Sequence, residues 1–338
     1  MRRRISRGLA ALVFIGKFFL AAAVSAEEQA IKVVYYPPWN VSKLPLYLAQ
    51  ERGIFETNGL KVSLTNPGSN DRLLAAMKNN EGEIYVVSSN HVALSRSAAG
   101  TDLVIVANTG HNYSVFLVAA SIARAEELKG KRIGTGASDG TPYQLTRLSL
   151  KRLGLDPDKD VTLVPYDERS STRATALLSG QVSGSLVSAD TIFELERTGE
   201  IKNFRILADH NKLKIYAGGG ADYAVSKAFL KNGRDKAKSF LSSICEGIAL
   251  ARRDKAAALA AIAKTAQKSD PAVLEFLYRI YVGEVIPARP YPRIEGVELG
   301  IQMAGSIVAG AGAVRAQDLV DPGLVEELDR EGRCAAGR

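Results

Sequence analysis

Small polar and aromatic residues, which could contact a ligand, follow several short apolar runs of this 338-residue chain. If those runs are strands of an open α/β sheet, their carboxyl ends form the edge at which such sheets bind ligands. Hydroxyl, amide and ring groups in these positions are typical of reversible binding of a small polar molecule. The candidate ligand contacts are Tyr36, Trp39, Asn40, Ser88, Ser89, Asn90, Thr109, His111, Ser138, Asp139, Thr141, Tyr143, Ser188, Asp190 and Tyr216.

Several of these candidates also stand where helices are expected to begin. The first turn of a helix presents free backbone N–H groups and partial positive charge, so several helix N-termini around one cleft favour an anionic group without any arginine. The expected starts are Thr141 as N-cap with Pro142 and Gln144, Thr191 with Glu194, and Ser88–Asn90 before His91. The same residues could be caps without ligand contact, because every helix benefits from a cap.

Four side chains in this set each have two interpretations. Trp39, the only tryptophan, lies in a proline-rich segment and either forms a wall of the ligand pocket or packs beneath its own loop. His111 either hydrogen-bonds the ligand or caps a loop. Asp139 and Asp190 would favour an amine or amide on the ligand if they point inward, and otherwise they are solvated or capping residues.

Enzymatic and metal chemistry find little support in the residue types. The three histidines, at positions 91, 111 and 210, have no metal-ligand spacing. No Ser-His-Asp order is visible, and the glycine-containing segment 134–140 lacks the Lys-Ser/Thr ending of a phosphate-binding loop. We therefore predict a non-enzymatic binding protein with no catalytic residues, no metal and no cofactor.

The first 26 residues have the composition of a secretory signal peptide. Four arginines among residues 2–7 precede an apolar stretch over 9–23, and Val24-Ser25-Ala26 supplies the small residues of a cleavage site. A membrane anchor is the alternative, but Lys17 cuts the apolar run short of the roughly 20 residues that a span needs. We predict export to the periplasm with cleavage after Ala26, and no lipid attachment there because no cysteine lies at that site.

Charge and cysteine content bear on partners and compartment. Residues 1–26 hold five of the 44 basic residues and none of the 36 acidic ones, which leaves a net charge of +3 for the remaining chain. This weak and scattered charge argues against nucleic acid as a partner, and the length suggests about two domains. An oxidising compartment permits a bridge between Cys245 and Cys334, and a buried free thiol is the alternative for Cys245.

Short β-rich runs alternate with helical patterns, which predicts an α/β fold with largely parallel sheets. The predicted strands are Ile31–Tyr36, Leu60–Thr65, Ile84–Ser88, Leu103–Asn108, Val115–Ala119, Lys131–Thr135, Val161–Pro165, Gly184–Val187 and Phe204–Ala208. After about residue 225 only helical patterns follow. The helix expected over Asp235–Arg253 places Ala237, Phe240, Leu241, Ile244, Ile248 and Ala251 on one stripe, which indicates a core-facing side.

Four segments, taken together, resemble the nitrate/sulfonate/taurine-binding family of periplasmic receptors, which has relatives concerned with thiamine-pyrimidine precursors. Their order and spacing match that family over roughly residues 31–230. The segments are LPLYLAQERGIF (44–55) with NGLKV (58–62), LKGKRIG (128–134), LGLDP (153–157) with KDV (159–161), and ALLSGQV (176–182). The chain departs from the family pattern at Ser183 and at Gly82-Glu83, where the family commonly has aspartate, and this bears on subfamily more than on fold.

The resemblance implies an α/β, two-lobed periplasmic-binding-protein clamshell of type II, with mixed, mostly parallel sheets flanked by helices and a helical C-terminal block. Lobe one would comprise residues 27–117 and 218–338, and lobe two residues 118–217. Two crossover strands, Val115–Ala120 and Gly218–Val225, would form the hinge. Three consecutive glycines at 218–220 would suit a hinge that closes on ligand, or would form an ordinary loop.

The resemblance also implies a function. The chain would be a monomeric receptor that delivers a small-molecule ligand to ABC permease subunits with a cytoplasmic ATPase. The family's ligands are nitrate, alkanesulfonates, taurine, pyrimidine precursors and aromatic carboxylates. A sensory receptor for a histidine kinase or chemoreceptor is one alternative. A pyrimidine-synthesis enzyme of the same fold is another, which the signal peptide and the lack of that branch's Cys-rich motif disfavour.

Overall fold

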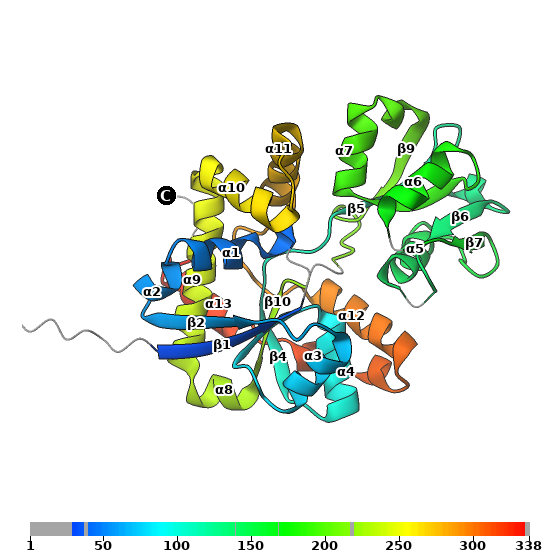
Figure 1. The fold of residues 1–338 in the computed structure, drawn as a ribbon. Helices are drawn as coiled ribbons and strands as arrows, with labels where there is room; N and C mark the ends of the chain where they lie inside the picture. Colours follow the sequence, from blue (N-terminus) through cyan, green and yellow to red (C-terminus); the bar gives the residue numbers. More distant parts are fainter. Residues whose placement is uncertain (1–28, 37–39, 139, 168, 217–219, 335–338) are drawn as a thin grey trace, which may run out of the picture.

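The computed structural model describes residues 29–36, 40–138, 140–167, 169–216 and 220–334. The chain forms two α/β lobes that lie side by side, each built on a five-stranded sheet with helices around it (Figure 1). Lobe one is the unit built on the sheet β2-β1-β3-β10-β4, and lobe two is the unit built on β7-β6-β8-β5-β9. The predicted fold class, a two-lobed clamshell with mixed sheets, is confirmed.

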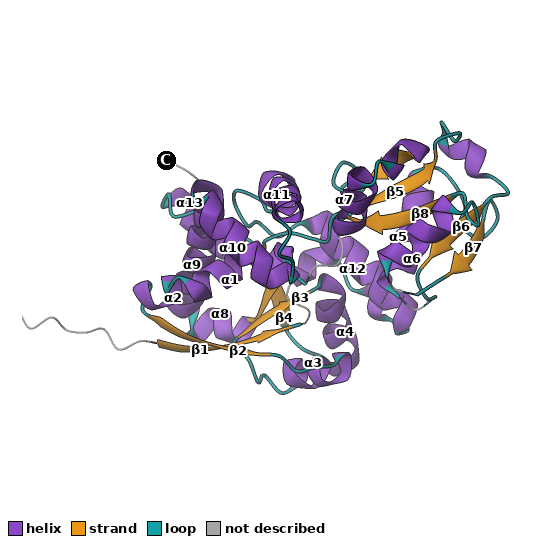
Figure 2. Ribbon diagram, turned by 45° about the horizontal axis from the view of Figure 1, so that its top comes forward, coloured by secondary structure: helices purple, strands orange, loops and turns teal. Residues whose placement is uncertain are grey.

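Lobe one is formed by the two ends of the chain and lobe two by its middle (Figure 2). The first part of lobe one contains β1 (Gln29–Tyr35), η1 (Val41–Lys43), α1 (Leu44–Glu51), α2 (Ile54–Thr57), β2 (Leu60–Thr65), α3 (Asn70–Lys78), β3 (Ile84–Val87), α4 (Ser89–Ala99) and β4 (Leu103–Asn108). Lobe two contains β5 (Ser114–Ala119), η2 (Ala125–Leu128), β6 (Arg132–Thr135), α5 (Thr141–Arg152), β7 (Thr162–Pro165), α6 (Ser170–Leu178), β8 (Gly184–Ser188), α7 (Ala189–Arg197), η3 (Glu200–Asn203) and β9 (Phe204–Asp209). The second part of lobe one contains β10 (Asp222–Ser226), α8 (Lys227–Asn232), α9 (Arg234–Arg253), α10 (Lys255–Ala266), α11 (Pro271–Ile280), η4 (Tyr281–Val285), α12 (Ile294–Ile307), η5 (Ala311–Ala313), η6 (Ala316–Leu319) and α13 (Gly323–Arg330).

The two sheets follow the same plan. In lobe one, β1 pairs in parallel with β2 and β3, whereas β10 runs antiparallel between β3 and β4. In lobe two, β6 pairs in parallel with β7 and β8, whereas β5 runs antiparallel between β8 and β9. The reversed strand of each sheet is the one that the chain enters directly from the other lobe.

Strand residues alternate between two apolar layers, as a sheet covered on both faces requires. In β3, Ile84 and Val86 face the layer under α1 and α9, whereas Tyr85 and Val87 face α3, α4 and α12. The predicted apolar stripe of α9 is confirmed, because all six of its residues are buried. Because both faces of such a strand are buried, its sequence is a continuous apolar run, and the sequence pattern reveals it.

The nine predicted strands are all present, with ends that shift by at most two residues. The predicted crossovers are wrong in position. Val115–Ala119 belongs to β5 and pairs with β8 and β9, so the chain crosses earlier, over residues 109–113 (the first crossover). The second crossover strand was predicted over Gly218–Val225, but β10 begins at Asp222 and belongs to the lobe-one sheet, so the return connection is residues 210–221 (the second crossover).

Lobe one also contacts lobe two outside the crossovers, on two flanks. On one flank, residues of α12 pack against lobe two in a buried apolar cluster made by Leu145, Leu186, Ile215, Leu299 and Met303. On the other, the rings of Phe193 in α7 and Phe276 in α11 lie 5.4 Å apart. Among the described residues, no helix is both long and apolar enough to cross a membrane.

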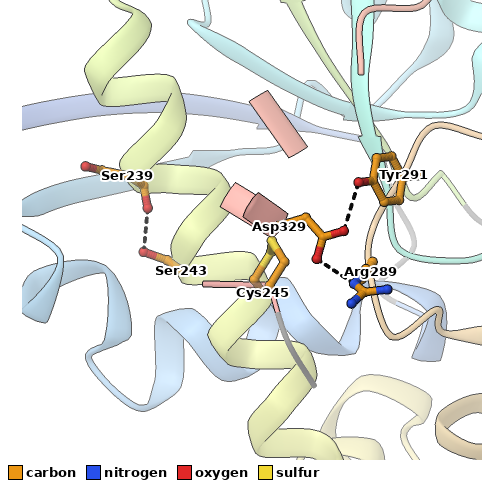
Figure 3. The surroundings of a disulfide bond; sticks show 7 residues. Ser239, Ser243, Cys245, Arg289, Tyr291 and Asp329 are labelled. Atoms are coloured by element: carbon orange, nitrogen blue, oxygen red, sulfur yellow. Dashed lines mark hydrogen bonds and ion pairs between the residues drawn. A yellow bond between two sulfur atoms is a disulfide. The ribbon is translucent and has the colours of Figure 1, made fainter. Parts of the chain in front are cut away.

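A disulfide joins Cys245 of α9 to Cys334, which follows α13 (Figure 3). The sequence had left this pairing open against a free thiol. The bridge spans 89 residues of chain, and beside it Asp329 of α13 accepts from the Tyr291 hydroxyl at 3.0 Å and pairs with Arg289 at 2.6 Å. The C-terminal segment is therefore attached to lobe one both covalently and by ion pairing.

Candidate ligand-binding site

In both lobes, the strand register places the carboxyl ends of strands next to the crossovers. In lobe one, Asp222, the first residue of β10, pairs with the last residues of β3 and β4, Val87 and Asn108. In lobe two, Ser114, the first residue of β5, pairs with Ser188 at the end of β8. The polar residues after these strands therefore gather around the two connections between the lobes, where ligands of such sheets bind.

A buried lysine lies at the centre of the lobe-one side. Lys43, the last residue of η1, is 1% exposed, and burial lowers the pKa of its ammonium to about 7. The second crossover passes against it: a Cβ added at Gly220 would lie 3.1 Å from Nζ, and the φ of +57° at Gly220 also favours glycine. The residue before Lys43 is also held in place, because Oγ1 of Thr109 donates to the carbonyl of Ser42 at 3.0 Å.

The start of α4 adjoins this lysine. Ser88 is the N-cap, as predicted, and its Oγ accepts from the N–H of Gly220 at 3.1 Å. His91 packs on the ring of Tyr36 with 4.6 Å between centroids, and its Nε2 lies 3.1 Å from Oδ1 of Asn70. Burial lowers the pKa of His91 to about 4, so this ring is neutral at physiological pH. The cap, the histidine and the second crossover form one connected polar group.

α12 covers the next two predicted contacts. The hydroxyl of Ser89 is buried and donates to the carbonyl of Gly296 at 3.0 Å. A Cβ at Gly300 would lie 2.7 Å from the backbone nitrogen of Asn90 and would collide with the Ser89 hydroxyl, so only glycine permits this packing. The first turn of α4 is therefore partly enclosed by α12, which limits how much of it a ligand could reach.

An arginine, a histidine and a tyrosine stack where the crossovers run side by side. His111, in the first crossover, has its ring centroid 5.1 Å from that of Tyr216 in the second. The guanidinium of Arg293 lies 4.4 Å over the Tyr216 ring, and its Nη1 is 3.1 Å from Nδ1 of His111. Nη2 of Arg293 donates to the carbonyl of Val285 at 2.9 Å, which fixes the guanidinium.

Side-chain amides brace the crossovers against the sheet. Nδ2 of Asn108 donates to Oδ1 of Asp222 at 2.7 Å, and its Oδ1 accepts from the N–H of Gly110 at 3.0 Å. Burial raises the pKa of Asp222 to about 6 despite that hydrogen bond. Asn40 reaches the first crossover, where its Nδ2 donates to Oδ1 of Asn112 at 3.5 Å. The lobe-one side is thus a hydrogen-bonded and largely buried assembly.

On the lobe-two side, α5 begins differently from the prediction. The N-cap is Gly140, Thr141 is already the first helical residue, and its side chain makes no cap hydrogen bond. The predicted box with Gln144 is wrong, because the N–H of Gln144 bonds to the carbonyl of Gly140 at 3.3 Å. Ser138 and Thr141 are exposed and Tyr143 is half-buried. These side chains lie on the accessible surface at the start of α5.

The N-cap of α7 also lies earlier in the chain than predicted. Ser188 is the N-cap, so Thr191 lies buried inside the first turn and is not a cap. The Ser188 hydroxyl donates to Oδ1 of Asp190 at 2.6 Å, and its N–H donates to Oγ of Ser170 at 2.9 Å. Burial and the charge of the exposed Asp190 raise the pKa of Tyr281 in lobe one to about 12. Asp190 also lines a cavity together with Lys268 and Val273 of lobe one.

Two cavities flank the contact between α7 and α11. One, of about 770 Å³, is lined by Phe193 and Phe276 together with Arg252, Lys255 and Arg279. The other, of about 570 Å³, lies between α6, α7 and the segment joining α10 to α11, and includes Asp190 and Thr191. Neither contains the Lys43–His111 assembly. We place the candidate site at the strand ends, because that is where polar groups of both lobes converge.

Sequence reasoning missed Lys43, Arg293 and Asp222. A lysine between Ser42 and Leu44 carries no sign of burial, and Arg293 comes 182 residues after His111, which it contacts. Trp39 and Asp139 lie outside the described residues. Within the described ranges, no group of three or more His, Cys, Asp or Glu side chains is arranged to hold a metal ion.

Comparison with known proteins gives the family. The profile of the family described as NMT1/THI5 like matches residues 40–258, well over half of the chain. The chain belongs to the NMT1/THI5-like family. The matched stretch contains Lys43, both crossovers and all of lobe two, so the family relation covers the lobe-two side and part of the lobe-one side of the candidate site.

Two curated relatives match part of the chain. YtlA of Bacillus subtilis (strain 168), named as a candidate binding protein, is 27% identical over 207 residues, which cover 60% of this chain and 62% of YtlA. The 4-amino-5-hydroxymethyl-2-methylpyrimidine phosphate synthase of Schizosaccharomyces pombe (strain 972 / ATCC 24843) is 26% identical over 226 residues, 63% of each protein. The matches thus span less than two thirds of either relative.

Solved structures confirm the fold over most of the chain. The periplasmic aliphatic sulphonate binding protein SsuA from Escherichia coli superposes with a TM-score of 0.65 at 19% identity, covering 87% of this chain and 92% of SsuA. At this identity, the likeness establishes the architecture that NMT1/THI5-like proteins share with such receptors, and not a ligand.

Proposed function

We propose that the protein is the periplasmic solute-binding component of an ABC importer and captures a small polar or anionic molecule by closure of its lobes. The ligand class is the one that the family resemblance implies: an alkanesulfonate, taurine, nitrate, a pyrimidine precursor or an aromatic carboxylate. The partners would be permease subunits with a cytoplasmic ATPase, and the receptor itself would be a monomer.

The observation that carries this proposal is the convergence of two sheet edges on two crossovers beside a buried cation. Lys43 is held against the second crossover with its side chain almost inaccessible. An ammonium in that position is stabilised by a negatively charged ligand, because the charge is desolvated already. The starts of α5 and α7 supply backbone N–H groups from the opposite lobe.

Export is part of the proposal and rests on residues 1–26. Arginines, an apolar run and a small-residue site in that order favour cleavage after Ala26. Protein recovered from the periplasm of the native host should have an intact mass that begins at Glu27. Recovery of the full-length chain from the cytoplasm would contradict it.

An enzymatic role is the second candidate, because one curated relative is a pyrimidine phosphate synthase. The candidate site holds a buried lysine, Lys43, and two buried histidines, His91 and His111, whose lowered pKa values keep their rings neutral. Ligand recovered unchanged after prolonged incubation supports a receptor, whereas a new product detected by mass spectrometry supports an enzyme.

The direct experiment is a thermal-shift screen of residues 27–338 against those five ligand classes. A ligand present at 100 times its dissociation constant should stabilise the protein by about 2.7 kcal/mol. Sulfonates or carboxylates should stabilise, and their uncharged counterparts should not. If no member of any class shifts the melting temperature, the proposed function is wrong.

A further inference from the structure

The three histidines are all buried, but only one has a ring nitrogen without a partner in the described chain. His210 lies between two hydroxyls, with Nδ1 2.9 Å from Oγ of Ser114 and Nε2 2.7 Å from Oγ of Ser149. Both nitrogens of His91 are likewise within hydrogen-bond distance of a partner. In His111, Nδ1 faces Arg293, whereas Nε2 is fully buried with no acceptor among the described residues.

The contact with Arg293 fixes which nitrogen of His111 carries the proton. An arginine guanidinium only donates, so Nδ1 must be the acceptor and the proton must lie on Nε2. Burial, with the charge of Arg293 as the next cause, lowers the pKa of His111 to about 3, so the ring stays neutral. His111 therefore presents a single N–H donor with a defined direction, and this donor is the unpartnered atom.

The position of this donor is also unusual. The other buried side-chain atoms without a partner belong to residues inside helices: Gln50, Arg96, Thr146 and Ser242. His111 instead lies in the first crossover, three residues after β4 and against Tyr216 of the second. The charged groups that act on its neighbour Arg293 are Asp222 and Glu295. A buried donor without a partner is costly, which makes an acceptor from outside the protein chain the expected complement.

We propose that Nε2–H of His111 donates to an oxygen of the bound ligand, and that Arg293 is the positioning residue that holds the ring as this donor. The ligand group is an oxyanion, a carboxylate, sulfonate or nitrate, because the arginine charge lies directly behind the imidazole. This inference rests on the proposed function and names which end of the ligand reaches the first crossover. The competing occupant is a buried water molecule.

The test is nitrogen NMR of the three imidazoles in ¹⁵N-labelled residues 27–338. The probes are methanesulfonate, acetate and nitrate, with dimethyl sulfone as the uncharged counterpart of methanesulfonate. Without a probe, His111 should show an unprotonated Nδ1 and a protonated Nε2 between pH 5 and 8, because Nδ1 accepts from Arg293. An anion that stabilises the protein should shift the Nε2 resonance and slow its proton exchange, and should leave His210 unchanged.

Two substitutions separate a donor from a packed ring. His111→Phe keeps a ring but has no donor, and the affinity for the stabilising anion should fall about 10- to 150-fold, as expected for a hydrogen bond to a charged group. His111→Gln keeps an N–H group near the position of Nε2 and should recover most of that affinity. Arg293→Met should release Nδ1, so that the imidazole spectrum shows both neutral tautomers.

The outcomes distinguish this inference from the proposed function. If an anion stabilises the unsubstituted protein and His111→Phe equally, or leaves Nε2 unchanged at saturation, the occupant is water and the inference is wrong while the receptor function stands. If none of the three anions stabilises the unsubstituted protein, the inference is wrong, and the screen of all five ligand classes decides the proposed function separately. Where a variant does not fold, the spectra of the unsubstituted protein decide.

Discussion

The two lobes share a sheet plan but differ in how exposed the residues after their strands are. In lobe one, the residues after the strands are mostly buried and joined by hydrogen bonds, with Lys43, Thr109 and His111 at most 1% exposed. In lobe two, the corresponding residues are largely accessible: Ser138, Thr141 and Asp190 are exposed. The same topology thus supports a preformed floor on one side and an open wall on the other.

This difference suggests a division of labour. A floor whose donors are already fixed can bind the charged group of a ligand with little further ordering, because the entropy of ordering its side chains has been lost on folding. An accessible wall gains contacts only when the lobes approach. We expect the ligand to bind lobe one first and lobe two to close over it, and the predictions below test that asymmetry.

The largest expected effect comes from removing the disulfide within lobe one. Replacing both Cys245 and Cys334 by Ala removes a bridge that closes a loop of 89 residues and should lower the free energy of unfolding by about 2–5 kcal/mol. Hydrogen exchange followed by mass spectrometry should show lost protection in α9 and α13, with lobe two unchanged. Equal loss in both lobes would mean that they do not unfold as separate units.

Removing the buried charge should have the next largest effect. Lys43→Met keeps the shape of the side chain, and anion affinity measured by calorimetry should fall roughly 10- to 150-fold, the range for a hydrogen bond to a charged group. Stability should be measured alongside, so that a loss of affinity is separated from a loss of fold. Lys202→Met, at an exposed position of lobe two, is the matched control and should change neither quantity.

The pH dependence follows from the same lysine. Its folded pKa of about 7 lies below the ordinary 10.5, so the unbound ammonium loses its proton above about pH 7. Anion affinity should be constant below that pH and fall up to tenfold per unit above it. Between about pH 7 and 10.5 the unfolded chain binds the extra proton, so stability should rise with pH, by about 1.4 kcal/mol per unit relative to Lys43→Met.

Titrations at pH 6, 7, 8 and 9 with both proteins check this dependence. Lys43→Met should show no loss of affinity over the range. A parallel decline in the two proteins would assign the titration to another group.

The smallest effect is expected on the open wall. Thr141 is exposed and makes no cap bond, so Thr141→Ala should change stability by less than about 0.5 kcal/mol. Its hydroxyl is one contact among several made on closure, and affinity should fall at most about fivefold, well below the effect at Lys43. A loss as large as that of Lys43→Met would reverse the proposed roles of the two lobes.

The sequence predicted the strands well because they form short runs rich in apolar residues between turn residues, and β3, β4, β5 and β8 are almost completely buried. It began the second crossover strand too early, because the glycines before Asp222 were interpreted as part of the hinge, and it placed the first crossover within β5. Thr141 and Thr191 were misjudged as caps, since Gly140 and Ser188 just before each helix take that role.

The candidate site was predictable only in part. The polar residues after each strand follow from topology, so positions such as Ser88, Thr109 and His111 could be named in advance. Burial of Lys43 could not, because lysine is almost never fully buried and nothing beside it in sequence marks the exception. The contact of Arg293 with His111 joins segments far apart in the chain, and such pairings need the folded structure.

Closure of the lobes around a small anion is the central claim, and small-angle X-ray scattering tests it most directly. The radius of gyration of residues 27–338 would be measured without ligand and with the most stabilising anion of the thermal-shift screen, at a saturation established by calorimetry. The account predicts a smaller radius for the bound protein, and a smaller decrease for Lys43→Met at the same anion concentration. An unchanged radius at proven saturation would contradict it.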